Sequence, residues 1–390
     1  MAVDLKLRSS RIVTPNGIIS GCLRIRSGKI AQLTEGLTDD REYSDCEVLE
    51  LGDDLVVPGF VDLHVHGGGG HDVMNGADSV IGLAEFLAQQ GTTSFFATTD
   101  TVAKEQMLAS IRGIAAAVEA QQEGEGAEIL GIHLEGPFLN VRQKGAFLPE
   151  TLLDCSWEVM QELEEACGGY LRRVTIAPEI EGALDLIRAL SSRGFLVSGG
   201  HTAASYEATM AGIRAGISVV THMYNAMQGL HHRNPGAVGA YLTSGDVVCE
   251  IIGDLFHVHP AAIQLVLQSK GLDHVYMISD AIVAAGLSPG VYDFAGRQIT
   301  VDERGLSTLS DGTIAGSTFF MKHAFKNLID ALGVSIENAV KLTAEVPAKV
   351  AGVFDRKGSL EPGKDADITV LGPDYQVKLC LTNGRVHYGA

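Results

Sequence analysis

Eight short apolar runs alternate with helical stretches through the middle of the chain. Apolar runs of this kind are typical of strands buried on both faces, as in a parallel sheet covered by helices. One intervening stretch places Ile111, Ile114, Ala115 and Val118 at helical spacing. Eight such units over about 250 residues predict a (β/α)8 barrel of the TIM type, with an open doubly wound sheet as the alternative. The runs are 57–66, 93–99, 129–134, 174–178, 195–198, 219–224, 248–252 and 275–278.

Both ends of the chain show a different pattern, in which apolar and polar residues alternate. Near the start, Val3, Leu5 and Leu7 alternate with charged residues, and near the end Leu379 and Leu381 alternate with polar ones. A period of two predicts half-buried antiparallel strands. We therefore expect a small β-sandwich domain formed by residues 1–57 together with 355–390, and a barrel domain over 58–354.

Composition limits the partners of the protein. Lys and Arg number 29 and Asp and Glu number 48 in 390 residues, which gives a net charge of −19. This charge repels polyanions, so we expect no nucleic-acid partner and no membrane surface. The first residues carry alternating charges without an apolar signal core, which predicts a cytoplasmic protein. Six scattered cysteines without a C-x-x-C pair are expected to be reduced thiols.

Side chains that could bind a metal stand where several of these strands should end. His64 and His66 are two residues apart, so on a strand their side chains share one face and can converge. Glu135 and His201 follow the third and fifth runs, and His222 lies near the end of the sixth. Because the carboxyl ends of barrel strands meet at one rim, we expect these five residues to lie together. Histidine and carboxylate ligands on separate strands suit Zn²⁺ or Fe²⁺.

Each of these residues also has an ordinary structural explanation. Glu135 could cap a helix, His201 could be a hydrogen-bonded core histidine, and Asp280, after the eighth run, could cap a loop. Their occurrence at successive strand ends favours the metal site. His133 would share a face with Glu135 but lie one layer deeper, so we expect it to be structural.

Longer motifs resemble the amidohydrolase superfamily and, within it, the N-acetylglucosamine-6-phosphate deacetylases. The H-x-H pair is shared by many amidohydrolases, whereas the motifs at 133–138 and 222–227 are far more specific to these deacetylases. The resemblance spreads over nearly the whole chain. It rests on PGFVD (58–62), HLEGPF (133–138), KGA (144–146), GHT (200–202), HMYNAM (222–227), HHRNPG (231–236), SDA (279–281) and AGS (315–317).

The resemblance implies a role for each matching residue. Glu135, His201 and His222 match the principal metal site, and Asp280 matches the catalytic acid and base. Family members with the H-x-H pair can hold two metals, so one or two divalent ions per chain are implied, zinc first, with iron, manganese or cobalt as alternatives. Phe147 replaces a histidine of some one-metal members, which leaves polarisation of the substrate carbonyl to metal. The implied sugar-phosphate contacts are Ala146, Asn225, Ala226, Arg233, His257, Ala315, Gly316 and Ser317.

The implied reaction is hydrolysis of N-acetyl-D-glucosamine 6-phosphate to D-glucosamine 6-phosphate and acetate by metal-bound hydroxide. The small-molecule substrate is an amino-sugar phosphate, and Arg233 is implied to reach the neighbouring site of a homodimer. A guanidinium suits this task because it binds phosphate as a planar fork.

Two other functions stay open at this point. One is a different amidohydrolase, acting on N-acyl-amino acids or cyclic amides. A dihydroorotase-like enzyme is disfavoured because the fourth strand region, 172–179, has no lysine to bridge two metals. The other is an inactive scaffold, whose signature would be the loss of metal ligands.

Overall fold

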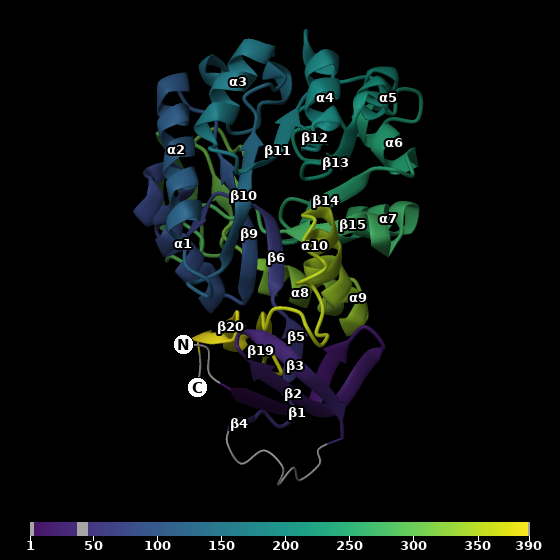
Figure 1. The fold of residues 1–390 in the computed structure, drawn as a ribbon. Coiled ribbons are helices and arrows are strands. Elements are labelled where there is room, and N and C mark those ends of the chain that lie inside the picture. Colours follow the sequence, from purple (N-terminus) through teal and green to yellow (C-terminus); the bar gives the residue numbers. More distant parts are fainter. Residues whose placement is uncertain (1–3, 37–45, 389–390) are drawn as a thin grey trace.

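Eight parallel strands form the barrel that the sequence predicts (Figure 1). The computed structural model describes residues 4–36 and 46–388. The two edge strands meet where the Asp280 N–H donates to the His64 carbonyl at 2.9 Å, which nearly closes the ring. In sheet order the strands are β6 (Phe60–Val65), β9 (Thr92–Thr99), β10 (Glu128–Glu135), β11 (Leu171–Ile176), β12 (Leu196–Gly199), β13 (Ile217–Val220), β14 (Val248–Ile252) and β15 (Val275–Ile278).

Six of the eight barrel strands have boundaries that differ from the predicted runs; β13, for example, ends at Val220 and not at Tyr224. The differences at β6 and β11 are informative. The run 57–66 breaks at Gly59 into β5 (Leu55–Pro58), which joins the terminal sheet, and β6 of the barrel. A Cβ at Gly59 would lie 2.2 Å from the Thr93 side chain, so this close approach requires glycine. Strand β11 begins at Leu171, before the predicted apolar run, which left out the charged Arg173; the structure buries Arg173 fully inside the barrel.

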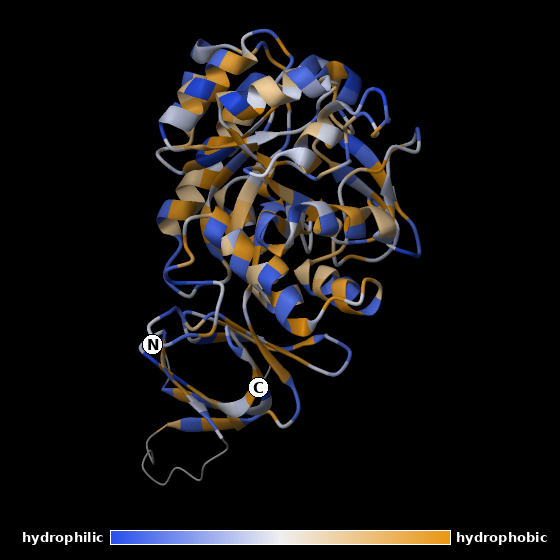
Figure 2. Ribbon diagram, turned by 90° about the vertical axis from the view of Figure 1, so that its right-hand side faces the viewer, coloured by the Kyte–Doolittle hydropathy of each residue, from blue (hydrophilic) through white to orange (hydrophobic). Residues whose placement is uncertain are grey.

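A helix follows each barrel strand and packs on its outer side. In α2 the buried Met107, Ile111 and Ile114 recur on one face, as the sequence predicts. Figure 2 shows the surface helices banded with hydrophilic and hydrophobic residues. Within the described ranges, every helix lacks the length or the apolar character that crossing a membrane requires. The helices are α1 (Ala77–Gln89), α2 (Lys104–Ala120), α3 (Trp157–Ala166), α4 (Ala183–Ser192), α5 (Tyr206–Ala215), α6 (Gly236–Thr243), α7 (Pro260–Lys270) and α8 (Met321–Asp330).

Strands from both ends of the chain form a second body below the barrel (Figure 1), which confirms the predicted small β domain. Hydrogen bonds join its strands in one sheet, ordered β21-β20-β19-β5-β1-β2-β3 with β4 on β1. Leu7, Ile25, Ile368 and Leu381 share its core. Val3 and the rest of 1–3, 37–45 and 389–390 lie outside the described residues. The strands are β1 (Leu5–Thr14), β2 (Gly17–Arg26), β3 (Lys29–Glu35), β4 (Glu47–Glu50), β5, β19 (Ile368–Leu371), β20 (Val377–Thr382) and β21 (Arg385–Tyr388).

A three-stranded antiparallel flap follows the eighth barrel strand. Arg297 anchors it by donating to the Asp100 carboxylate and to the Ala146 carbonyl, both at 2.5 Å. The flap was not predicted, and it forms one wall above the barrel rim. Its strands are β16 (Gly290–Phe294), β17 (Arg297–Val301) and β18 (Ser307–Thr308).

The remaining elements are short. They are β7 (Gly67–Gly68), β8 (His71–Asp72), the 3-10 helices at 73–75, 141–143, 149–151 and 272–274, α9 (Ile336–Val340), a π-helical turn (Lys341–Glu345) and α10 (Val346–Val350).

Candidate metal centre and active-site pocket

Two groups of possible metal ligands lie next to each other at the carboxyl ends of the barrel strands. The first triad is His64, His66 and Asp280, and the second triad is Glu135, His201 and His222. Within each triad the candidate ligand atoms lie within 4.8 Å of one another. All six residues are buried.

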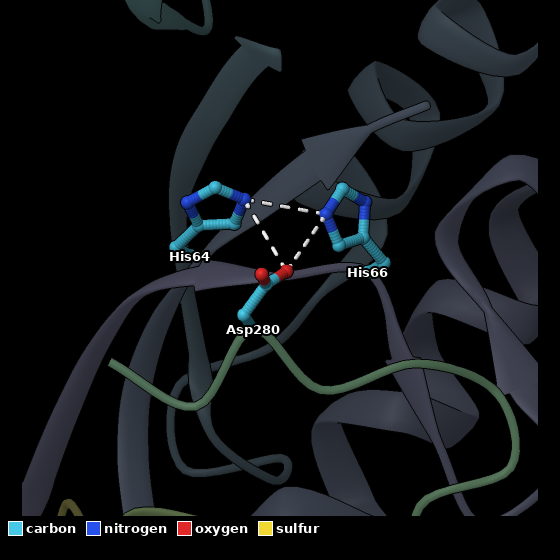
Figure 3. A group of neighbouring side chains, drawn as sticks. All are labelled: His64, His66 and Asp280. Atoms are coloured by element: carbon cyan, nitrogen blue, oxygen red, sulfur yellow. Dashed lines mark hydrogen bonds and ion pairs between the residues drawn. The ribbon is translucent and has the colours of Figure 1, made fainter. Parts of the chain in front are cut away.

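The first triad converges on one point between three side chains (Figure 3). The Nε2 atoms of His64 and His66 are 3.2 Å apart. The Asp280 Oδ1 atom lies 3.6 Å from the first nitrogen and 3.3 Å from the second. The expected convergence of the H-x-H pair is therefore present.

Glu135 connects the two triads. Its Oε1 atom lies 3.2 Å from His201 Nε2 and 2.9 Å from His222 Nε2, and these two nitrogens are 3.0 Å apart. Its Oε2 atom lies 3.3 Å from His66 Nε2. One carboxylate thus faces ligands of both triads, as a bridging ligand would.

The tautomers of two histidines suit metal binding. The carboxylate of Glu250 can only accept when ionised, so His64 Nδ1 donates to it, at 2.8 Å. His201 Nδ1 donates to the Gln143 carbonyl at 2.8 Å. A proton held on Nδ1 leaves the Nε2 lone pair pointing into the site, which is the usual arrangement of a metal-ligating histidine. The donor set therefore fits a divalent transition metal.

The buried carboxylates at the site favour a positively charged group between them. Burial lowers the pKa of His64, but the carboxylates around it, Glu135 foremost, outweigh burial and raise that pKa to about 10. Burial raises the pKa of Asp280, but the nearby His64 and His66 hold it below its usual value. A bound metal cation would satisfy the same field in place of the second proton on His64, and the ring would then be neutral with Nε2 free to bind the metal.

Backbone strain accumulates at the strand ends that carry the ligands. His201, His222 and Asp280 have φ angles of +47°, +27° and +51°. Non-glycine residues in this region cost on the order of 1–3 kcal/mol each and persist where the surroundings fix them. Here the strained turns lie where the three side chains line one pocket.

A pocket of about 190 Å³ opens above the ligands. Phe147 lies against His201 with ring centroids 5.0 Å apart, and Phe294 of the flap meets His66 edge-on at 6.0 Å. Neither lysine nor arginine is among the described residues that line this pocket. The predicted site residues in its lining are His66, Glu135, Ala146, His201, His222, Asn225, Ala226, His257, Asp280 and Gly316.

The other predicted residues lie around this pocket. His64 is fully buried beneath it. Ala315 and Ser317 are buried beside the eighth strand end, where the Ser317 N–H donates to the Asp280 carbonyl at 2.8 Å. Arg233 is exposed, lies outside the pocket lining and contacts His232 Nε2 at 2.7 Å. Arg233 therefore does not lie with the other predicted site residues of its own chain.

His133 has the structural surroundings that we expected. It is fully buried, and its Nε2 and Nδ1 atoms lie 2.8 Å from Thr175 Oγ1 and 3.2 Å from Thr98 Oγ1. Burial holds its pKa well below the usual histidine value, so the ring is neutral.

Sequence reasoning missed the charged residues that support the ligands. Arg173 and Glu250 are fully buried inside the barrel. Glu179 accepts from Thr202 Oγ1 at 2.6 Å, next to His201, and Asp254 Oδ2 lies 2.7 Å from His257 Nδ1. A charge inside an apolar run, as in Val248–Ile252, was the signal that could have drawn attention to Glu250.

Comparison with known proteins agrees with this geometry. The sequence profile of the amidohydrolase family matches residues 55–387, and one described as the composite domain of allantoinase matches 6–54. An N-acetylglucosamine-6-phosphate deacetylase of Bacillus subtilis is 37% identical over 100% of this chain and 98% of its own length. An N-acetylgalactosamine-6-phosphate deacetylase of Escherichia coli O157:H7 is 36% identical over 97% and 98%.

Solved structures are also similar over the full chain. The N-acetyl-D-glucosamine-6-phosphate deacetylase of Mycobacterium smegmatis, in complex with N-acetyl-D-glucosamine-6-phosphate, superimposes with a TM-score of 0.91 at 32% identity. The match covers 99% of this chain and 100% of that one. The deacetylase of Thermotoga maritima gives 0.87 at 31% identity, over 99% and 100%. On this evidence the chain belongs to the amidohydrolase family.

Proposed function

We propose that this protein is a metal-dependent deacetylase that hydrolyses the acetamide of N-acetyl-D-glucosamine 6-phosphate to D-glucosamine 6-phosphate and acetate. The observation that supports this most strongly is the pair of ligand triads joined by Glu135 beneath a pocket. The full-length similarity to deacetylases of phosphorylated amino sugars supports the substrate class.

In this proposal Glu135, His201 and His222 hold one divalent metal. His64 and His66, with Glu135 as the bridge, allow a second. Zinc is the first candidate, and iron, manganese or cobalt are alternatives because histidine and carboxylate sites accept all of them. When bound, such a metal polarises the acetamide carbonyl and brings the pKa of a coordinated water toward ~7.

Asp280 is the proposed acid and base. Its lowered pKa keeps the carboxylate ionised at neutral pH and thus able to accept the proton of the attacking water. It then delivers that proton to the amine nitrogen, which cannot depart as an anion in water. His257, whose Nδ1 contacts Asp254 at 2.7 Å, presents its other nitrogen to the substrate. Ala146, Asn225, Ala226 and the turn 315–317 are the proposed contacts to the sugar.

The phosphate group requires a cation that the described pocket lining does not supply. We propose that Arg233 of a second copy supplies it, in a homodimer. The exposure of Arg233 outside the pocket of its own chain supports this arrangement. We also propose a cytoplasmic enzyme with one domain formed by 1–57 and 355–390 and the other by 58–354.

N-acetylgalactosamine 6-phosphate is the second candidate substrate, because a relative of similar identity is named for it. The two sugars differ only in configuration at C4. Acetate release should therefore be measured on both phosphorylated sugars and on unphosphorylated N-acetylglucosamine, together with elemental analysis of the protein. Preferential hydrolysis of the glucosamine derivative supports the proposal. Faster turnover of N-acyl-amino acids or cyclic amides would instead identify a different amidohydrolase. No amidase activity at full metal content would identify an inactive scaffold.

A further inference from the structure

We propose that Glu250 is a positioning residue that orients one metal ligand in each triad and thereby couples the two metal sites. This inference rests on the proposed function, because it assumes that both triads bind metal. It assigns a task to a buried carboxylate that neither lines the pocket nor belongs to either triad.

One oxygen atom of Glu250 accepts a hydrogen bond from a residue of each triad. The Oε1 atom accepts from His64 Nδ1 at 2.8 Å and from the backbone N–H of His222 at 2.9 Å. His64 belongs to the first triad and His222 to the second. A shift of this single carboxylate would therefore displace a ligand of each metal.

The main chain of Glu250 contributes to the same geometry. Its carbonyl accepts from the Met223 N–H at 2.9 Å, one residue after His222. His222 has a φ angle of +27°, in the region that non-glycine residues rarely adopt. The side chain and the carbonyl of Glu250 together hold the strained turn at which His222 leaves β13.

The second oxygen atom of Glu250 is fixed from the opposite side. Its Oε2 atom accepts from Arg173 Nη1 at 2.5 Å and from the Tyr276 hydroxyl at 2.8 Å. Arg173 is itself held by Ser198 and Thr221, at 2.7 and 3.0 Å. Glu250, Arg173 and Tyr276 are each 0% exposed. The carboxylate thus meets four donors and has no free rotation, which makes it a rigid support for the ligands.

Replacement of Glu250 by glutamine should act on the ligands specifically. The new NH2 group must face either His64 Nδ1 and the His222 N–H, or Arg173 and Tyr276, all of which are donors in the native site. Facing His64, the amide is best accommodated if that ring takes its other tautomer, with the proton on Nε2. A protonated Nε2 cannot bind a metal, because its lone pair is used.

The test compares Glu250→Gln with the full-length wild-type protein, with zinc as the probe. Metal equivalents are measured after dialysis, and the affinity of each equivalent is measured by competition with a chelator. We expect both equivalents to bind about 10- to 100-fold more weakly in Glu250→Gln. Ser198→Ala is the matched control, because Ser198 contacts Arg173 but neither Glu250 nor a ligand, and it should bind zinc normally.

Folded Glu250→Gln that binds both equivalents as tightly as wild type would overturn the inference while leaving the metal centre intact. Wild type that binds no zinc would instead reject the proposed function, and the inference with it. If Glu250→Gln does not fold, Tyr276→Phe decides the matter, because it removes one donor to Oε2 and preserves the Arg173 ion pair. A weakening of both equivalents in that variant supports coupling, and unchanged affinity for both contradicts it.

Discussion

The Nε2 atoms of His64 and His66 face each other across 3.2 Å. Nδ1 of His64 donates to Glu250, so Nε2 is the ring atom that faces this gap. The surrounding carboxylates raise the pKa of both histidines, and a metal ion bound by both Nε2 atoms would satisfy that field in place of two protons. The relationship therefore favours a metal at the first triad in addition to one at the second.

The first prediction concerns metal content. Glu135→Gln should lose most bound metal, because Glu135 faces ligands of both triads. His64→Asn should lose at most one equivalent, because it belongs to the first triad only. Elemental analysis of the purified variants measures both effects. His231→Asn, an exposed histidine, serves as the control and should retain wild-type metal. Full metal content in Glu135→Gln would refute its assignment as a ligand.

The second prediction concerns proton transfer. Asp280→Asn preserves the shape of the side chain but cannot accept a proton, so kcat should fall by ~10²–10⁴. Binding of the phosphorylated sugar, measured by calorimetry, should persist. Metal content is measured in parallel because Asp280 also belongs to the first triad. Near-normal turnover at equal metal content would assign the acid and base role to another group.

Much of the site could be predicted because its signals are local. His64 and His66 share a strand face by virtue of their spacing alone, and barrel topology brings the remaining strand ends to one rim. The eight apolar runs were visible because parallel strands are buried on both faces. The tertiary structure then supplied the distances and added Asp280 to the candidate ligands around His64 and His66.

The supporting residues could not be predicted in the same way. The meeting of Arg173 and Glu250 depends on strands β11 and β14, which lie apart in the sheet and face each other only when the barrel closes. The flap over 290–308 has short strands whose position against the pocket depends on Arg297 and its tertiary partners. Neither the contact between Arg173 and Glu250 nor the position of the flap can be recognised from the spacing of residues along the sequence.

The third prediction concerns stability at mildly acidic pH. Burial and the nearby Lys322 lower the pKa of His323 from 6.5 to about 4. A lowered histidine pKa means that the unfolded chain binds the proton more tightly, so the stabilisation is complete above pH 6.5 and decreases as the pH falls toward 4. Between pH 7 and 5.5 the free energy of unfolding should decrease by about 1 kcal/mol from this residue alone.

Urea unfolding at both pH values measures this effect against His323→Asn. The asparagine carbonyl can still accept from the Phe320 N–H, which lies 2.9 Å from Nδ1 in the native protein, but it does not titrate. Other acidic groups titrate in both proteins, so they cancel in the comparison. Equal pH dependence in the two proteins would show that His323 is not held neutral by its surroundings.

The fourth prediction concerns Arg233 and phosphate recognition. Arg233→Ala should lower kcat/KM for the phosphorylated sugar by roughly 30-fold or more, since loss of one partner of a desolvated ion pair costs ~2–5 kcal/mol. The unphosphorylated sugar should be affected little, because the lost contact is to the phosphate. Arg188→Ala removes an exposed arginine from α4 and is the matched control, with no expected change for either sugar.

Mixed dimers determine which subunit Arg233 serves. If it acts across the interface, a dimer of one Arg233→Ala chain and one Asp280→Asn chain has one site with both defects and one site with neither. Mixing two nearly inactive proteins should then restore part of the activity, up to half of the wild-type rate per mixed dimer. If Arg233 serves its own chain, every site in the mixture carries one defect and activity stays low. Absence of recovery after demonstrated subunit exchange would therefore exclude a role across the interface.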